Sequence, residues 1–315
     1  MGDSLPTTAV HTGTSTPAPR EKPDPTDMMA DSPPSSPTSS TVVSRALHRL
    51  NNDVDPKQCI SISIYACFLT GFTSSPSFSA CYVWCGFQTG NLAQLGLAAA
   101  RAFSMDPYRT YGFQKPDQQA LTSLLAFILG TCCGRIGDKW GNRTRRWLMS
   151  ATLVQVLLAM AAALTAWKSG ETGIALERGE PSWHTPLGMA ALAFLSATMG
   201  IQGIVGKRIA SPMNTTVVLT TTWVELFNDP LLLTAHLAPS RDVRLMGVSG
   251  VILGAFISRA ILQSPAGQAG CLGVLAGLRL IQALWWGFVP GVKVDWEKVG
   301  KGVSTSKDVR GGAVL

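Results

Sequence analysis

Long tracts without a charged side chain constrain this sequence more than any other feature. No Asp, Glu, Lys or Arg occurs in residues 58–100, 118–134, 147–167 or 181–206. Each tract is long enough to cross a bilayer, which takes about 17 to 25 residues. Charged residues make up only 14% of the chain, against roughly 25% in soluble domains. We therefore expect an all-α integral membrane protein.

Two further apolar stretches extend this pattern, at residues 245–262 and 268–288. Each contains a single arginine, Arg259 in the first and Arg279 in the second. One arginine does not prevent insertion, although an ionisable side chain in lipid costs about 2.5 to 3.5 kcal/mol on insertion scales. The sequence thus predicts about six transmembrane helices.

Two apolar segments remain that are too short or too polar for simple spans. The first, 88–100, follows a break at 71–76, and the second, 210–238, contains Asn214, Glu225 and Asp229. They are either re-entrant segments or two extra helices. Because cytoplasmic loops are enriched in Lys and Arg, we prefer six spans with both termini cytoplasmic. Eight spans would place the basic cluster at 135–146 on the opposite side. The sequence does not identify the host membrane.

The chain divides into two tails and two related membrane segments. Residues 1–57 are rich in Pro, Ser and Thr and predict a disordered cytoplasmic tail. We expect a first membrane repeat at 58–182, a second at 183–290, and a short cytoplasmic tail at 291–315. The net charge of +7 reflects membrane topology, so we expect no nucleic-acid partner.

Three matches in the same order suggest the internal repeat. Residues 127–135 and 251–259 share Ile, Leu, Gly and Arg at equivalent positions, and residues 88–95 align with 219–226. Gly71 and Gly200 end the first apolar stretch of each half. Three crossings per repeat would place the halves in opposite orientations, as in inverted-topology repeats. The two re-entrant segments would then enter from opposite faces and meet near the midplane, around a substrate or ion pathway.

The order of these motifs resembles the YoaK-like family of uncharacterised multi-pass membrane proteins. The resemblance covers about 61–290, and it rests on Gly71-Phe-Thr-Ser74, Gln88-Thr-Gly-Asn91, Gly200-Ile-Gln202, Asn214 and the following Thr-rich segment. It implies a multi-pass fold and no established activity. Similar proteins typically have an acidic residue in place of Ser74 and a Thr-Gly pair in place of Thr220-Thr221.

Polar side chains inside the apolar segments are the candidates for a pathway. Gln88 and Asn91 offer amide groups beside Gly90, and a helix starting near Asn91 would present its N-terminal amides to an anion or carboxylate. Alternatively, Asn91 only caps that helix and Gly90 only makes the turn. The full candidate set is Gln88, Thr89, Gly90, Asn91, Gln202, Asn214, Thr220, Thr221, Glu225 and Arg279.

Glu225 and Arg279 are candidates for a buried ion pair, because a charged group at membrane depth normally faces a partner or water. The alternatives are an interfacial Glu225 and an Arg279 that binds backbone carbonyls. Functional and structural interpretations of both residues stay open at this point.

The leading functional hypothesis is a transporter or channel for a small solute or ion that the sequence does not identify. The alternatives are a membrane scaffold or receptor, and an intramembrane enzyme acting on a lipid. We find no catalytic motif, and none of the seven cysteines has zinc spacing. We therefore expect no metal and no cofactor. Gly-x-x-x-Gly patterns leave open a homo-oligomer. We expect the lipid bilayer as a partner, together with a small-molecule or ion substrate that the sequence does not identify.

Overall fold

The computed structural model covers the membrane segments and leaves most of both tails outside. Asn214 and most residues of the expected tails at 1–57 and 291–315 are not among the described residues. The described residues are 44, 47–107, 109–177, 180–211, 213, 216–217, 219–234 and 236–292.

Helices are the only regular elements in the described part of the chain. A short helix, η1, leads directly into the first long helix, and two short helices follow later, one after α4 and one before α9. The elements are η1 (Pro56–Cys59), α2 (Ile60–Cys81), α3 (Gln88–Ala102), α4 (Lys115–Cys132), α5 (Gly134–Trp140), α6 (Arg145–Ser169), α7 (Pro186–Ile209), α8 (Thr220–Phe227), α9 (Pro239–Gln263) and α10 (Gly267–Trp286).

Six helical segments among the described residues are long and apolar enough to cross a membrane. This confirms the all-α class and the expected number of spans, and it makes the chain a multi-pass membrane protein. Neither α3 nor α8 is among them, so the eight-helix alternative finds no support. The segments are Pro56–Cys81, Lys115–Trp140, Arg145–Ser169, Pro186–Ile209, Pro239–Gln263 and Gly267–Trp286.

Side-chain caps and prolines set where the long helices begin. Thr144 accepts a hydrogen bond from the Trp147 amide at the start of α6, and Thr185 accepts one from the Gly188 amide at the start of α7. Each cap satisfies one of the amides that a helix leaves unpaired at its N-terminus. Proline occupies the first position of α7 and of α9, where no amide is needed.

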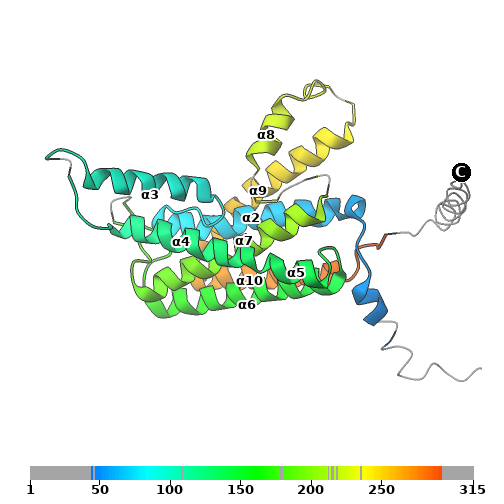
Figure 1. The fold of residues 1–315 in the computed structure, drawn as a ribbon, viewed down its shortest axis with the longest axis horizontal. Helices are drawn as coiled ribbons and strands as arrows, with labels where there is room; N and C mark the ends of the chain where they lie inside the picture. The colour runs from blue at the N-terminus through cyan, green and yellow to red at the C-terminus, as the bar shows by residue number, and fades with distance from the viewer. Residues whose placement is uncertain are drawn as a thin grey trace, which may run out of the picture. The chain divides into compact units, whose positions relative to one another are not determined.

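Helices α2 and α7 form the centre of the bundle. In their most apolar windows, 72% of α2 residues and 61% of α7 residues are buried, against 28% in α4 and in α9. Helix α2 packs against α9 and α10, α7 packs against α4 and α6, and α6 also packs against α10 (Figure 1). The outer helices therefore present most of their apolar surface outward.

Glycines bring two of these helix pairs into backbone contact. A methyl group added at Gly71 of α2 would overlap the Val251 carbonyl of α9, and one at Gly254 of α9 would overlap the Phe68 carbonyl of α2. The pair α4 and α7 uses Gly130 and Gly200 in the same way, against the carbonyls of Ala197 and Phe127. Small residues permit this close approach in lipid, where apolar side chains alone do not drive helices together.

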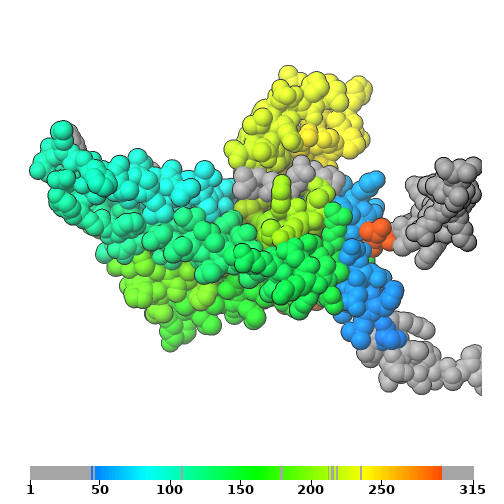
Figure 2. Space-filling view, in the orientation of Figure 1, coloured from blue at the N-terminus to red at the C-terminus, as the bar shows by residue number. Residues whose placement is uncertain are grey.

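Helices α3 and α8 pack against different long helices. Helix α3 packs along α4 and α8 packs along α9 (Figure 1). In the space-filling view, α8 and the first part of α9 stand away from the surface around them (Figure 2). The chain just before each short helix does come together, since a methyl group added at Gly86 would lie 3.5 Å from the Val217 side chain. The expectation that both segments enter from opposite faces and meet near the midplane stays a prediction.

Two arginines hold together the end of the bundle where α2 and α6 begin and α7 and α10 end. Arg145 donates to the carbonyl oxygens of Arg49 at 3.1 Å and Val289 at 2.8 Å. Arg208 donates to the Gly134 carbonyl at 2.5 Å and pairs with Asp138. We call this end, with its many Lys and Arg residues, the basic end.

Gly254→Ala should destabilise the protein, because the new methyl group would overlap the Phe68 carbonyl of α2. Overpacking of this kind costs about 1 to 3 kcal/mol, which corresponds to a drop of several degrees in the Tm of purified protein in detergent. Gly277→Ala on α10 is the matched control, since nothing lies within 4 Å of its added methyl group. Equal Tm values for both variants would contradict the backbone contact.

Candidate functional site

The most unusual side chain in the bundle is Arg279, which is fully buried. It lies seven residues before the end of α10, about 10 Å along the helix from that end. Its Nη2 donates to Gln202 Oε1 at 2.6 Å and to Thr73 Oγ1 at 3.4 Å, and its Nη1 donates to Gln282 Oε1 at 3.2 Å. Its Nε has no hydrogen-bond partner, and no ion pair among the described residues includes it.

Gln202 of α7 links this guanidinium to α2. Its Nε2 donates to the Ala66 carbonyl at 2.9 Å, to Thr70 Oγ1 at 2.8 Å and to Thr216 Oγ1 at 3.2 Å. These acceptors fix the orientation of the amide, since a reversed amide would turn its NH2 group against the guanidinium. The result is a buried polar layer, consisting of Thr70, Thr73, Gln202, Thr216, Arg279 and Gln282.

A small cavity adjoins the polar layer. Its volume is about 20 Å³, which leaves room for about one water-sized particle. Gln155 and Trp286 line it, and both are nearly fully buried. Gln155 Oε1 and Trp286 Nε1 have no hydrogen-bond partner in the described structure. The other residues that line this central cavity are Ile62, Ser63, Ala66, Thr152, Gln202, Val205, Gly206, Ile209, Thr216 and Gln282.

Of the sequence candidates, the structure brings Gln202 and Arg279 together, and it separates Glu225 from them. Glu225 Oε2 lies 3.1 Å from Arg244 Nη2, on the hairpin of α8 and α9. The expected pair of Glu225 with Arg279 is therefore wrong, because the neighbouring helix offers a nearer cation. Thr220 and Thr221 are exposed on α8, and Asn214 lies outside the described residues.

Gln88 and Asn91 belong to a second polar cluster at the start of α3. Gln88 Nε2 donates to Ser123 Oγ at 3.1 Å, and Asn91 Nδ2 donates to the same oxygen at 3.2 Å and to the Trp84 carbonyl at 3.1 Å. Ser123 Oγ lies 2.8 Å from Ser196 Oγ on α7. These contacts anchor α3 to α4 and α7. Thr89 and Gly90 are exposed on α3.

Cys85, in the loop before α3, lies close to both the polar layer and the second polar cluster. Its thiol donates to the Thr73 carbonyl at 3.6 Å. Burial raises the pKa of Cys85, so the thiol stays protonated at neutral pH and acts as a hydrogen-bond donor, not as a nucleophile.

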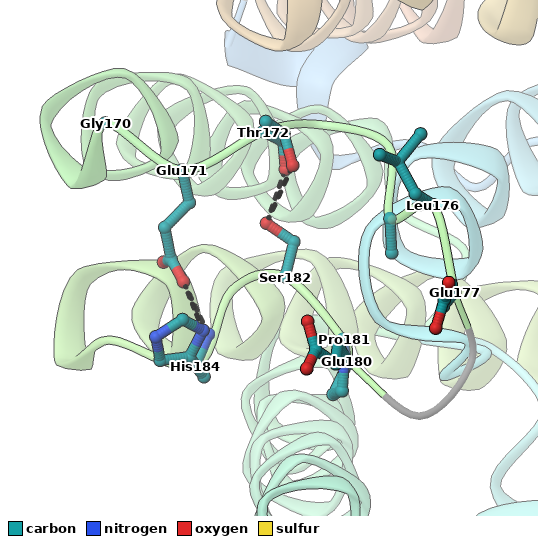
Figure 3. A pocket seen from close by; sticks show the side chains of 10 residues that line it. Gly170, Glu171, Thr172, Leu176, Glu177, Glu180, Pro181, Ser182 and His184 are labelled. Atoms are coloured by element: carbon teal, nitrogen blue, oxygen red, sulfur yellow. Dashed lines mark hydrogen bonds and ion pairs between the residues drawn. The ribbon is translucent and has the colours of Figure 1, made fainter.

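The loop between α6 and α7 encloses a larger pocket of about 460 Å³ at the other end of the bundle (Figure 3). Glu177 and Glu180 line it, and Glu171 Oε1 lies 3.0 Å from His184 Nδ1. Glu171 also accepts hydrogen bonds from the His184 amide at 2.8 Å and from Thr185 Oγ1 at 2.5 Å. Its oxygens therefore close the loop onto the start of α7. No group of metal-binding side chains gathers here or elsewhere in the described residues.

Sequence reasoning missed Thr70, Thr73, Gln155 and Gln282. The sequence does contain a signal for three of these residues. Thr70 and Thr73 are three residues apart, as are Arg279 and Gln282, so each pair shares one face of its helix. Two polar residues on one face of an apolar helix indicate a buried polar contact, but they do not show which helix supplies it.

Gln202→Leu and Gln155→Leu should affect stability differently. Leu at 202 removes the nearest acceptor of Arg279 and the donor to Thr70, which should cost about 2 kcal/mol and lower the Tm by about 4 to 8 °C. Leu at 155 removes an unpartnered oxygen, so we expect the Tm to stay equal or to rise. Tm measurements in detergent test this, with exposed Gln263→Leu on α9 as the control. A stable Gln202→Leu variant would contradict the network.

Comparison with known proteins identifies a family for this chain. No curated protein and no solved structure matches the chain. A family model described as a protein of unknown function (DUF1275) matches residues 62–285, which include α2, the polar layer and nearly all of α10. The match confirms the resemblance to an uncharacterised multi-pass family that the motifs suggested. The chain belongs to the DUF1275 family.

Proposed function

We propose that this protein is a carrier or channel for a small solute, and that the solute crosses the bundle through the polar layer. The observation that carries this proposal is the contact between buried Arg279 and Gln202 beside the central cavity. An ionisable residue inside a membrane bundle is costly, and such residues normally serve ion or substrate pathways.

The glycine contacts support an inverted repeat. Gly130 and Gly254 are 124 residues apart, as are Phe127 and Val251, and Gly71 and Gly200 are 129 apart. The contact of Gly200 with the Phe127 carbonyl thus has its counterpart in the contact of Gly71 with the Val251 carbonyl. Each contact joins a helix of one half to a helix of the other. Transporters with inverted repeats typically have two halves whose helices pack against each other across the repeat interface.

The repeat offset also relates two residues at the pathway. Gln155 of α6 and Arg279 of α10 are separated by the same 124 residues as Gly130 and Gly254. Both are buried, and both lie beside Gln202 and Gln282 at the central cavity or in the polar layer. The pathway that we propose therefore runs along the interface of the halves, where inverted-repeat transporters hold their substrates.

This location revises the set of pathway residues. Gln202 and Arg279 stay in it, and Gln155, Gln282 and Thr70 join them. Gln88 and Asn91 act as anchors of α3, and Glu225 acts within the α8–α9 hairpin. The orientation with both termini cytoplasmic remains part of the proposal, and it places the basic end inside the cell.

Gln155→Leu should reduce transport without loss of fold. The purified chain is reconstituted in lipid vesicles, and uptake of small neutral and charged solutes is followed. Loss of the Gln155 amide at the cavity removes a polar contact to the passing solute and should lower uptake about tenfold. Gln263→Leu, exposed at the end of α9, should keep the wild-type rate. Absence of any solute flux through the wild-type protein would overturn the proposal.

Removal of residues 1–43 distinguishes a carrier from a scaffold that acts through its tail. The cut must end before Arg49, because the carbonyls of Arg49 and Asn52 accept hydrogen bonds from Arg145. A carrier should retain its uptake rate after this deletion. Loss of uptake by a truncated protein with an unchanged Tm would assign the activity to the tail instead.

A further inference from the structure

We infer that the solute is a small anion and that Arg279 is the cation that binds it. This inference rests on the proposed function and narrows its substrate class. It follows from the charge of the polar layer, from its unused hydrogen-bond donors, from the charges at the two ends of the bundle and from the size of the central cavity.

The polar layer has a positive charge that its own residues do not neutralise. A guanidinium keeps its charge in proteins, and the acceptors around Arg279 are the neutral groups of Gln202, Gln282 and Thr73. A buried charge without a counterion is strongly unfavourable. Among the described residues no carboxylate pairs with Arg279, so an anion that enters the site would supply the missing countercharge.

The unused donors lie on the same side of α10. Arg279 Nε and Trp286 Nε1 both lack a partner, and both groups can only donate hydrogen bonds. Arg279, Gln282 and Trp286 follow at intervals of three and four residues, which places them along one face of the helix. Gln282 and Trp286 line the central cavity, and Arg279 adjoins it through its hydrogen bonds to Gln202 and Gln282. An anion would accept from such donors, although Gln155 Oε1 at the same cavity is an unpartnered acceptor.

The charges at the two ends favour entry from the basic end. The central cavity extends from Gln202 toward Ile62, Ile209 and Trp286, which lie near that end of their helices. Basic residues outnumber Asp53, Asp55 and Asp138 there. At the other end, Glu171, Glu177 and Glu180 (Figure 3), with Asp106 and Asp117, offset the basic residues Arg101, Arg109, Lys115 and Lys168. A field of this sign attracts anions to the mouth of the pathway. The basic residues of this end include Arg135, Lys139, Arg143, Arg146, Lys207 and Arg208.

The size of the central cavity limits the anion. About 20 Å³ admits about one water-sized particle, so a halide fits in this state, whereas an oxyanion such as nitrate or formate requires the cavity to widen. Sugars and nucleotides do not fit in this state.

Chloride, nitrate and formate are the probes for a flux and binding experiment on the full-length chain. Flux into vesicles is compared with that of neutral urea and glycerol. Arg279→Met removes the charge and keeps the length, and it should lower anion flux about a hundredfold or more. Arg259→Met on α9 is the matched control and should keep the wild-type rate. Arg279→Lys keeps the charge but loses the several N–H donors of the planar guanidinium, so it should retain part of the flux.

A binding measurement on the wild-type protein keeps the test independent of variant folding. Chloride in excess of its Kd by about tenfold should raise the Tm by about 3 °C relative to gluconate at equal ionic strength, because gluconate does not fit the central cavity. Arg279→Met should lose this rise and Arg259→Met should keep it.

The outcomes test the anion site and the carrier function separately. Anion flux and a chloride-dependent Tm that both require Arg279 would support both proposals. Flux of neutral solutes alone, with no anion effect on Tm, would overturn the anion site and leave the carrier standing. A chloride effect on Tm that requires Arg279, with no flux of any solute, would support the anion site and overturn the carrier. Absence of both signals would overturn both.

Discussion

The arrangement of this bundle depends on backbone contact at four glycines. Within lipid, helices gain little from burying apolar side chains against one another, because lipid tails are equally apolar. Gly71 and Gly254 allow α2 and α9 to approach closely, and Gly130 and Gly200 do the same for α4 and α7. These contacts fix the rotation of α2 and α7, and that rotation determines which of their polar side chains face the centre. The polar layer is thus a consequence of where the glycines lie.

Two polar clusters in the same bundle show different degrees of hydrogen-bond satisfaction. Around Ser123, the amides of Gln88 and Asn91 find acceptors on the loop before α3 and on α4. Around Arg279, several polar groups lack partners and the charge has no counterion among the described residues. A satisfied network stabilises one conformation, whereas an unsatisfied one raises the free energy of that conformation. That difference supports an anchoring role for the first cluster and the binding role that we propose for the second.

The sequence predicts the helices of this protein better than their contacts. Tracts without charge locate the spans, because charged side chains are excluded from lipid along the whole length of a helix. The partner of Arg279 was not predictable in the same way, since Gln202 lies 77 residues away and the contact depends on how α7 is rotated. Glu225 was misassigned for the same reason: its distance to Arg244 is set by the short α8–α9 hairpin, and hydropathy does not report on hairpin geometry.

Arg279 lacks a counterion and a partner for its Nε among the described residues, which raises the question of why a protein would retain it. A methionine of similar length would fill the site without a desolvated charge, but it would leave Gln202 Oε1 and Gln282 Oε1 without their donor. A charge that is desolvated in this way needs a compensating interaction in another state. Binding of an anion would provide it, because the ion would neutralise the guanidinium and accept from its Nε at once. Loss of this one charge should therefore remove both the anion flux and the stabilisation that a bound anion provides.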